Sequence, residues 1–265
     1  MDREARDQRI VNQANQPNNW LVCPQVRPEA VSRIFLFPYA GGAPSAFNKW
    51  SPEFPSTIET HIVHYPGRGS RHNEALLNSL DSLVEKLTHA IQPLLDIRFS
   101  FFGHSLGGTV AFELARHLRH NGLPQPSALF ISACAAPQVP KSHPPIHTFP
   151  DDEFLNSLKE LGGIPNEISQ NNELLDILLP VLRADFELIE TYQHVPGEPL
   201  ECPILAFGGF DDPRVSLEQL EGWAMHTNAG FEAKYFAGDH FFINAARQSI
   251  IDEIASVAML SRNDG

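Results

Sequence analysis

The sequence predicts an α/β fold with a mostly parallel central sheet and helices on both faces. Short apolar runs typical of buried strands alternate with amphipathic segments along most of the chain, and a G-x-S-x-G turn joins one such strand to one such helix. With 265 residues the chain can bury the core of one large domain. We expect that single domain over residues 20–265, after a polar and flexible leader at 1–19.

The expected strands and helices follow one another in order. Strands are predicted at 33–37, 61–65, 99–102, 128–131, 204–207 and 231–236, where apolar and β-branched residues gather. Helices are predicted at 45–50, 79–95, 106–120, 216–226 and 245–260. In the second helix apolar side chains recur at i, i+3 and i+4 spacing; these are Leu80, Leu83, Val84, Leu87 and Ile91. Because helices connect successive strands, the strands are expected to run parallel.

The alternation stops between about 136 and 199. This stretch has no convincing strand pattern, but it has helical patterns at 151–161 and about 173–194. Ligand sites gather at the carboxyl ends of the strands in such sheets, so we interpret the insertion as a helical lid over the site. The alternative is that the extra helices only add stability.

Composition excludes several classes of protein. Lys and Arg number 19 against 32 Asp and Glu, which gives a net charge of −13 and argues against a nucleic-acid partner. No apolar run approaches the roughly 18 residues that a membrane span requires. Three widely spaced cysteines, Cys23, Cys134 and Cys202, form no C-x-x-C motif, so we expect neither disulfides nor a zinc site. With no apolar signal segment at the N-terminus, a cytoplasmic protein is expected.

The candidate nucleophile is Ser105, in Gly103-His104-Ser105-Leu106-Gly107. A serine on a sharp strand-to-helix turn has a strained backbone, which exposes its hydroxyl at the tip of the turn. Glycines on either side leave room for the neighbouring strand and helix. A tight turn that merely contains a serine is the alternative, and the flanking strand and helix argue against it.

A serine hydroxyl requires a base, and the base requires an orienting acid. In the α/β-hydrolase arrangement these follow in the order Ser, Asp or Glu, His, on loops after late strands. His240 directly follows the last predicted strand. Asp211 and Asp212 both follow the strand at 204–207; we select Asp212, in the pattern G-x-x-D-P-x-V, and interpret Asp211 as a turn residue. Asp239 is interpreted as a turn residue as well.

The oxyanion that forms on attack requires at least two N–H donors. Leu106, at the start of the helix, is expected to supply one. Ala40, in the glycine-bearing loop after the first strand, is the candidate for the other. That loop lacks the lysine of a phosphate-binding loop and the third glycine of a dinucleotide turn, so we do not expect it to bind a phosphate group or a dinucleotide cofactor. No histidines show metal-ligand spacing, so no metal is expected either.

The sequence resembles the stand-alone (type II) thioesterases that accompany non-ribosomal peptide and polyketide synthases. The likeness runs from about Trp20 to the last helix. It consists of Phe37-Pro38-Tyr39-Ala40-Gly41-Gly42, Tyr65-Pro66-Gly67-Arg68, Gly103-His104-Ser105-Leu106-Gly107-Gly108, Leu182-Arg183-Ala184-Asp185 with Tyr192, Asp212-Pro213 and Gly238-Asp239-His240-Phe241. Integrated thioesterase domains often carry their acid where this chain reads Ser132-Ala133-Cys134, which favours the stand-alone type.

The resemblance implies a Ser105 nucleophile, a His240 base, an Asp212 acid and oxyanion donors at Ala40 and Leu106. It implies hydrolysis of acyl groups from the 4′-phosphopantetheine arm of acyl- or peptidyl-carrier proteins, which clears misprimed or stalled chains, with no cofactor of the enzyme's own. Release of medium-chain fatty acids from an acyl-carrier protein and general carboxylesterase activity remain alternatives, and a non-catalytic binding module is disfavoured by the intact Ser, Asp and His. A monomer is the default expectation.

Overall fold

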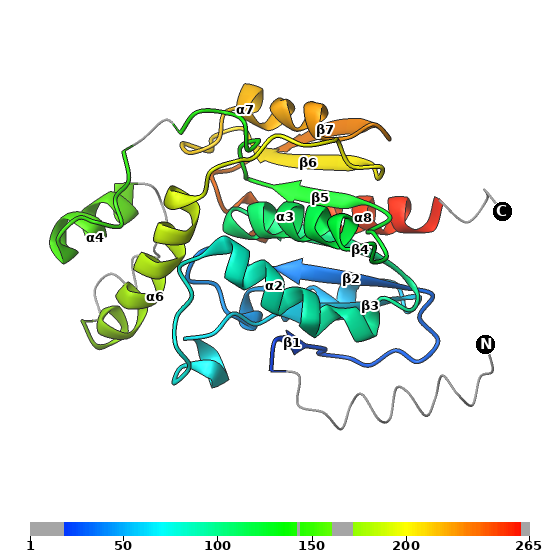
Figure 1. Ribbon diagram of the computed structural model, residues 1–265, viewed down its shortest axis with the longest axis horizontal. Helices are drawn as coiled ribbons and strands as arrows, with labels where there is room; N and C mark the ends of the chain where they lie inside the picture. The colour runs from blue at the N-terminus through cyan, green and yellow to red at the C-terminus, as the bar shows by residue number, and fades with distance from the viewer. Residues whose placement is uncertain (1–18, 142–143, 161–171, 261–265) are drawn as a thin grey trace.

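The computed structural model describes residues 19–141, 144–160 and 172–260, so all but Asn19 of the expected leader lies outside the described residues. A seven-stranded sheet forms the centre of the molecule (Figure 1). Its strands are β1 (Leu21–Val22), β2 (Ser32–Phe37), β3 (Ile58–Val63), β4 (Arg98–His104), β5 (Leu129–Ser132), β6 (Ile204–Gly209) and β7 (Phe231–Phe236). The helices are α2 (Leu80–Ile91), α3 (Leu106–His120), α4 (Asp151–Glu160), α6 (Asn172–Thr191), α7 (Leu217–Glu221) and α8 (Arg247–Leu260).

The sheet has the strand order β1-β3-β2-β4-β5-β6-β7, and all pairs from β3 to β7 are parallel. The prediction of a mostly parallel α/β sheet is therefore confirmed. The exception is β1, which pairs antiparallel with β3 through Leu21–Val63 and Val22–Ile62. The sequence did not predict this strand, because two residues are too few to show an alternating pattern.

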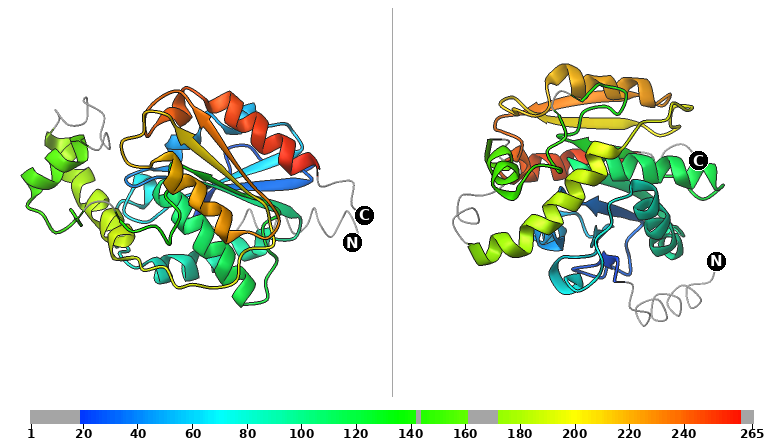
Figure 2. Two further views of the ribbon diagram at one scale, coloured as in Figure 1. Left: turned by 90° about the horizontal axis from the view of Figure 1, so that it is seen from above. Right: turned by 60° about the vertical axis from the view of Figure 1, so that its left-hand side comes forward.

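Each face of the sheet has its own apolar core, because successive side chains of a strand point to opposite faces. On β2, Phe35 and Phe37 pack with apolar residues of α2 and α3, whereas Ile34 and Leu36 pack with apolar residues of α8. The views in Figure 2 show α8 on one side of the sheet and α2 with α3 on the other. Helices cover both faces, as predicted.

Some element boundaries differ from the predicted ones. The helix expected at 45–50 is a single 3₁₀ turn, Pro44–Phe47. The strand expected at 61–65 is β3, which starts three residues earlier and ends two residues earlier. The helix expected at 216–226 starts with a capping box at Ser216 and Gln219 but changes to a 3₁₀ helix at Gly222–His226. Within the described residues, no helix has both the length and the apolar character of a membrane span.

Helices α4 and α6 lie in the stretch between β5 and β6, beyond the carboxyl ends of the strands (Figure 1). They share a small apolar core of their own, made of Ile146, Phe154, Leu158, Leu182 and Phe186. Ala40, from the loop after β2, packs against this core. The two helices are thereby joined to the edge of the sheet at which the loops after β2, β4, β6 and β7 gather.

Candidate active site

Ser105 occupies the turn between β4 and α3. Its backbone has φ 54° and ψ −119°, in a region that residues with a side chain seldom adopt. The Ser105 N–H donates to the carbonyl of Ser132, at the end of β5, at 2.8 Å, which holds the turn against the neighbouring strand. Only 9% of the Ser105 surface is exposed. The strained turn therefore holds Ser105, a mostly buried residue, at the carboxyl edge of the sheet.

The glycines on either side of Ser105 are required by close backbone contacts. A Cβ at Gly103 would lie 2.1 Å from the carbonyl oxygen of Gly107. A Cβ at Gly107 would lie 2.0 Å from the carbonyl oxygen of Phe37 and 2.8 Å from that of Pro38. The first turn of α3 thus packs directly against the end of β2, and the loop that starts at Pro38 lies beside Ser105.

The structure brings His240 and Asp212 together across the loops after β7 and β6. His240 Nδ1 lies 2.9 Å from Asp212 Oδ2, and both side chains are almost fully buried. Asp212 Oδ1 accepts hydrogen bonds from the backbone N–H groups of Arg214 (2.8 Å) and Val215 (3.3 Å). The carboxylate is held on both oxygens, so its orientation toward His240 is fixed.

The neighbouring aspartates have other positions. Asp211 is exposed, and its N–H donates to the carbonyl of Gly238 at 3.0 Å. Asp239 accepts a hydrogen bond from the N–H of Phe241 at 2.8 Å, an arrangement typical of a turn. Of the three carboxylates, Asp212 is the one that contacts the imidazole of His240.

The second nitrogen of His240, Nε2, is buried and has no hydrogen-bond partner among the described residues. The imidazole lies beside His104, the residue before Ser105, with 5.3 Å between the ring centroids. Burial lowers the pKa of His240 below its ordinary value; the Asp212 hydrogen bond opposes this effect, and the positive charge of Arg214 adds to it. A neutral imidazole with one unoccupied nitrogen is able to accept a proton.

Two backbone segments meet at the candidate oxyanion donors. Leu106 is the first residue of α3, where N–H groups have no partner within the helix. Ala40 lies in the loop after β2, and the close contacts of Gly107 place this loop against the start of α3. The two residues named from the sequence thus belong to adjacent segments.

One pair of site residues was not assigned a role from the sequence. Arg68, from the loop after β3, donates to both carboxylate oxygens of Asp185 on α6, at 2.6 and 2.7 Å. The same carboxylate accepts the N–H of Gly41 at 2.7 Å. Both residues occur in motifs that carry the resemblance, but 117 positions separate them, and no local pattern pairs them.

Cys23, Glu59 and His61 form the one group of three possible metal ligands found within the described residues, with ligand atoms within 4.8 Å of one another. Glu59, however, accepts hydrogen bonds from Arg33 Nε (3.1 Å) and from the N–H of Arg27 (2.9 Å), and it contacts His61 (2.8 Å). These contacts lower the pKa of Glu59 to about 2, although burial alone would raise it. The carboxylate is thus already occupied, and the group lies apart from Ser105, beside the starts of β2 and β3.

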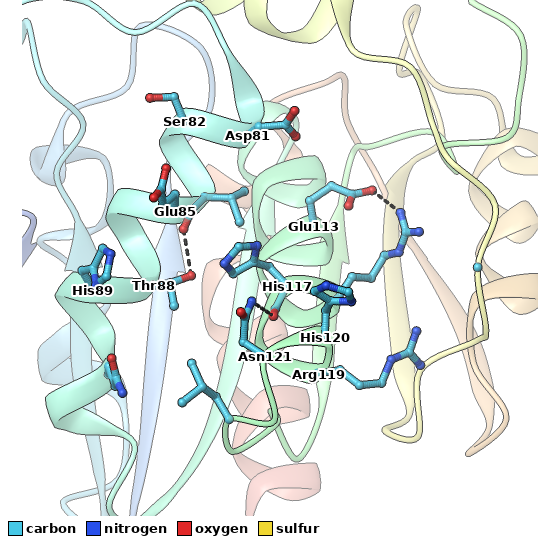
Figure 3. Close-up of a pocket in the computed structure, with 15 residues that line it drawn as sticks. Asp81, Ser82, Glu85, Thr88, His89, Glu113, His117, Arg119, His120 and Asn121 are labelled. Carbon is cyan, nitrogen blue, oxygen red and sulfur yellow. Dashed lines mark hydrogen bonds and ion pairs between the residues drawn. The ribbon is translucent and has the colours of Figure 1, made fainter.

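A separate hollow lies between α2 and α3 (Figure 3). Polar and charged side chains line it, among them Glu85, His89, Glu113, His117 and His120. Two arginines of α3 that line this hollow bind the segment before β6. Arg116 donates a hydrogen bond to the carbonyl of Val195, and Arg119 donates to the carbonyls of Glu198 and Pro199. Ser105, Asp212 and His240 do not line this hollow.

Known proteins resemble this chain over nearly its whole length. The thioesterase domain family model matches residues 32–257. Gramicidin S biosynthesis protein GrsT of Aneurinibacillus migulanus is 42% identical over 238 residues, which cover 90% of this chain and 93% of that protein. Thioesterase PikA5 of Streptomyces venezuelae is 35% identical over 236 residues, covering 89% of this chain and 84% of that protein.

The structural comparison agrees with the sequence comparison. The structure of the type II thioesterase BorB from the borrelidin biosynthetic cluster matches with a TM-score of 0.83 and 31% identity. The match covers 90% of this chain and 97% of that one. This chain therefore belongs to the thioesterase family, hydrolases of thioesters, and has the fold of its type II members.

Proposed function

We propose that this enzyme hydrolyses acyl thioesters carried on the 4′-phosphopantetheine arm of carrier proteins in non-ribosomal peptide or polyketide biosynthesis, with Ser105, His240 and Asp212 as its catalytic residues. The observation that carries the chemistry is the buried Asp212–His240 pair with its unpartnered Nε2, next to the strained turn of Ser105. The names of the relatives, GrsT from gramicidin S biosynthesis and BorB from the borrelidin cluster, support the pathway class.

In the proposed mechanism, Ser105 Oγ attacks the thioester carbonyl carbon and its proton passes to His240 Nε2. The carbonyl oxygen becomes an oxyanion, which the N–H groups of Ala40 and Leu106 stabilise. His240 then gives its proton to the departing thiolate of the pantetheine arm. Afterwards the same nitrogen takes a proton from a water molecule, whose oxygen attacks the acyl-enzyme. The bond between Ser105 Oγ and the acyl carbon then breaks, Oγ recovers the proton from His240, and the free acid leaves.

We propose that α4 and α6 act as the lid expected at about 136–199. They lie beyond the carboxyl ends of the strands, and Ala40 packs against their apolar core. An acyl chain attached to Ser105 would lie next to this apolar surface. We propose that the enzyme meets its carrier proteins in the reducing cytoplasm, where its three cysteines would stay as thiols.

The test is intact-protein mass spectrometry of acylated carrier protein incubated with the wild type and with Ser105→Ala. We expect the wild type to restore the free pantetheine thiol and the variant to lose this activity. Deacylation that persists in Ser105→Ala would contradict the mechanism. A parallel series with short acyl groups, medium-chain acyl groups and small diffusible esters tests the substrate class; small esters cleaved while all acyl carriers stay intact would contradict it in favour of a carboxylesterase.

A further inference from the structure

We infer that Arg68 and Asp185 are positioning residues for the oxyanion donor at Ala40: the Arg68–Asp185 pair fixes the 38–42 loop to α6. The inference rests on the proposed function, because it concerns the loop that we assign to oxyanion stabilisation. It adds a role for two residues whose side chains hydrogen-bond to each other and to the 38–42 loop rather than to Ser105 or His240.

The first observation is a network of short hydrogen bonds. Asp185 Oδ2 accepts one hydrogen bond from the N–H of Gly41 at 2.7 Å and a second from Nη1 of Arg68 at 2.6 Å. Asp185 Oδ1 accepts Nη2 of Arg68 at 2.7 Å. Gly41 N belongs to the same peptide group as the carbonyl carbon of Ala40, so this bond fixes the plane of the peptide next to the Ala40 N–H.

The second observation is the close packing of Gly41 on α6. Gly41 has φ +74°, and a Cβ at this position would lie 2.8 Å from Cδ2 of Leu182, one helical turn before Asp185. The loop and the helix therefore meet both through a hydrogen bond and through a contact that leaves no space for a side chain. A displacement of α6 would act directly on the Ala40–Gly41 peptide.

The third observation is the burial of both charges: Arg68 is 7% exposed and Asp185 is 3% exposed. Charges removed from water are costly unless each is paired and hydrogen-bonded, and apolar residues would often stabilise a fold equally well. Here the carboxylate uses its bonds to join three segments: the loop after β3, the 38–42 loop and α6. This geometry favours a role in placing the loop over a role in stability alone.

A misplaced donor should reduce the rate of the chemical step more than the binding of substrate, since the oxyanion exists only in the transition state and the intermediate. Removal of one oxyanion donor costs about 10²- to 10³-fold in kcat in enzymes of this chemistry. For Asp185→Asn, which leaves the donor in place but loosens it, we expect kcat to fall by about 10- to 100-fold with KM within about twofold of the wild type.

The decisive readout is a trifluoromethyl ketone analogue of the acyl thioester. Ser105 Oγ adds to its carbonyl carbon, the proton passes to His240, and the carbonyl oxygen becomes an oxyanion at the same position as in catalysis. We expect Asp185→Asn to weaken the binding of the ketone by the same factor by which it lowers kcat. The corresponding alcohol, which cannot form the adduct, should bind both enzymes equally.

Glu59→Gln is the matched control. It disrupts another buried pair, Arg33–Glu59, beside the starts of the strands rather than their carboxyl ends. We expect it to lower the Tm while kcat and the ketone affinity of the folded enzyme stay unchanged. An equal loss of ketone affinity in Glu59→Gln, or wild-type ketone affinity in Asp185→Asn, would overturn the positioning role.

If Asp185→Asn fails to fold, the double variant Arg68→Met/Asp185→Leu replaces both charges by apolar groups of similar size, so that no unpaired charge is left buried. Because Gly41 has lost its acceptor, the double variant should show losses of kcat and of ketone affinity similar to those expected for Asp185→Asn. Wild-type values of both would overturn the inference.

Failure of the proposed function has a different signature: carrier deacylation would then persist in Ser105→Ala. Loss of activity in Ser105→Ala together with unimpaired Asp185 variants refutes the positioning role alone.

Discussion

Asp212 Oδ2 lies 2.9 Å from Nδ1 of His240, while Asp211, one residue earlier, is exposed and makes no such contact. Two backbone N–H groups hold the other oxygen of Asp212, so the carboxylate fixes both the orientation and the tautomer of the imidazole. In the proposed mechanism this places the proton on Nδ1 and leaves Nε2 free to act as the base.

We predict that Asp212→Asn lowers kcat by about 10⁴-fold, because an amide in this position favours the wrong imidazole tautomer. Asp211→Asn is the adjacent control and should change kcat by about twofold at most, since it alters an exposed side chain. Both variants are assayed by mass spectrometry of the acylated carrier. Equal losses would contradict the assignment of Asp212 as the orienting acid.

The pH dependence of the reaction should report the environment of His240. Burial and the nearby Arg214 lower the pKa of this base, so the acid limb of kcat/KM should have its midpoint below pH 6.5, the ordinary value. Arg214→Met removes the positive charge but keeps the backbone N–H that donates to Asp212. We therefore expect the acid limb to move to higher pH.

The control for this pH profile is Lys86→Met, which removes an exposed charge on α2. Its profile should coincide with that of the wild type. A profile of Arg214→Met that stays in place, or moves to lower pH, would contradict the assignment of His240 as the base whose titration limits the rate.

Stability should decrease on acidification because several histidines are buried. The pKa of His226 is lowered to about 4, mainly by burial, with His194 and Arg116 adding to the effect, and burial also lowers the pKa of His104. In the unfolded chain these imidazoles take up protons at about pH 6.5, whereas in the folded protein they stay neutral at that pH. Their contribution to the free energy of unfolding is therefore complete above pH 6.5 and is lost as the pH falls toward 4. His226 alone should contribute roughly 1 to 2 kcal/mol to this loss.

Urea unfolding between pH 7 and 4.5 tests this expectation. His226→Phe, which cannot be protonated, should show a smaller decrease in the free energy of unfolding over that range. His72→Phe, at an exposed position, should leave the pH dependence as in the wild type. A pH dependence in His226→Phe as steep as that of the wild type would contradict the prediction.

The glycines of the Ser105 turn should not tolerate alanine. Gly107→Ala would place a Cβ 2.0 Å from the carbonyl oxygen of Phe37, and we expect destabilisation of more than about 3 kcal/mol or no folded protein. Gly122→Ala is the comparison, since Gly122 also has a special backbone, with φ +65°, but no atom lies within 4 Å of its Cβ position. There we expect about 1 kcal/mol, from the backbone conformation alone. Urea midpoints that do not differ between the two variants would show that the close contact is not what demands glycine.

Local patterns in the chain predicted six of the seven strands of the sheet. Six strands and the helices between them follow from periodic apolar residues, because the repeats of two and 3.6 residues reflect the geometry of each element rather than its surroundings. The strand β1 was not predicted, because it has only two residues and its pairing with β3 exists only in the folded sheet. The same local signals led to Ser105 and His240, each of which lies in the loop or turn that follows a predicted strand.

The relations between distant residues depend on tertiary contacts. Asp211 and Asp212 are chemically identical in the sequence, and only the paths of the loops after β6 and β7 bring Asp212 to the imidazole. Arg68 and Asp185 are 117 positions apart, and each looks like a surface charge in its own motif. They pair, buried, because the packing of α6 on the 38–42 loop excludes water from both charges, and no local pattern encodes that packing.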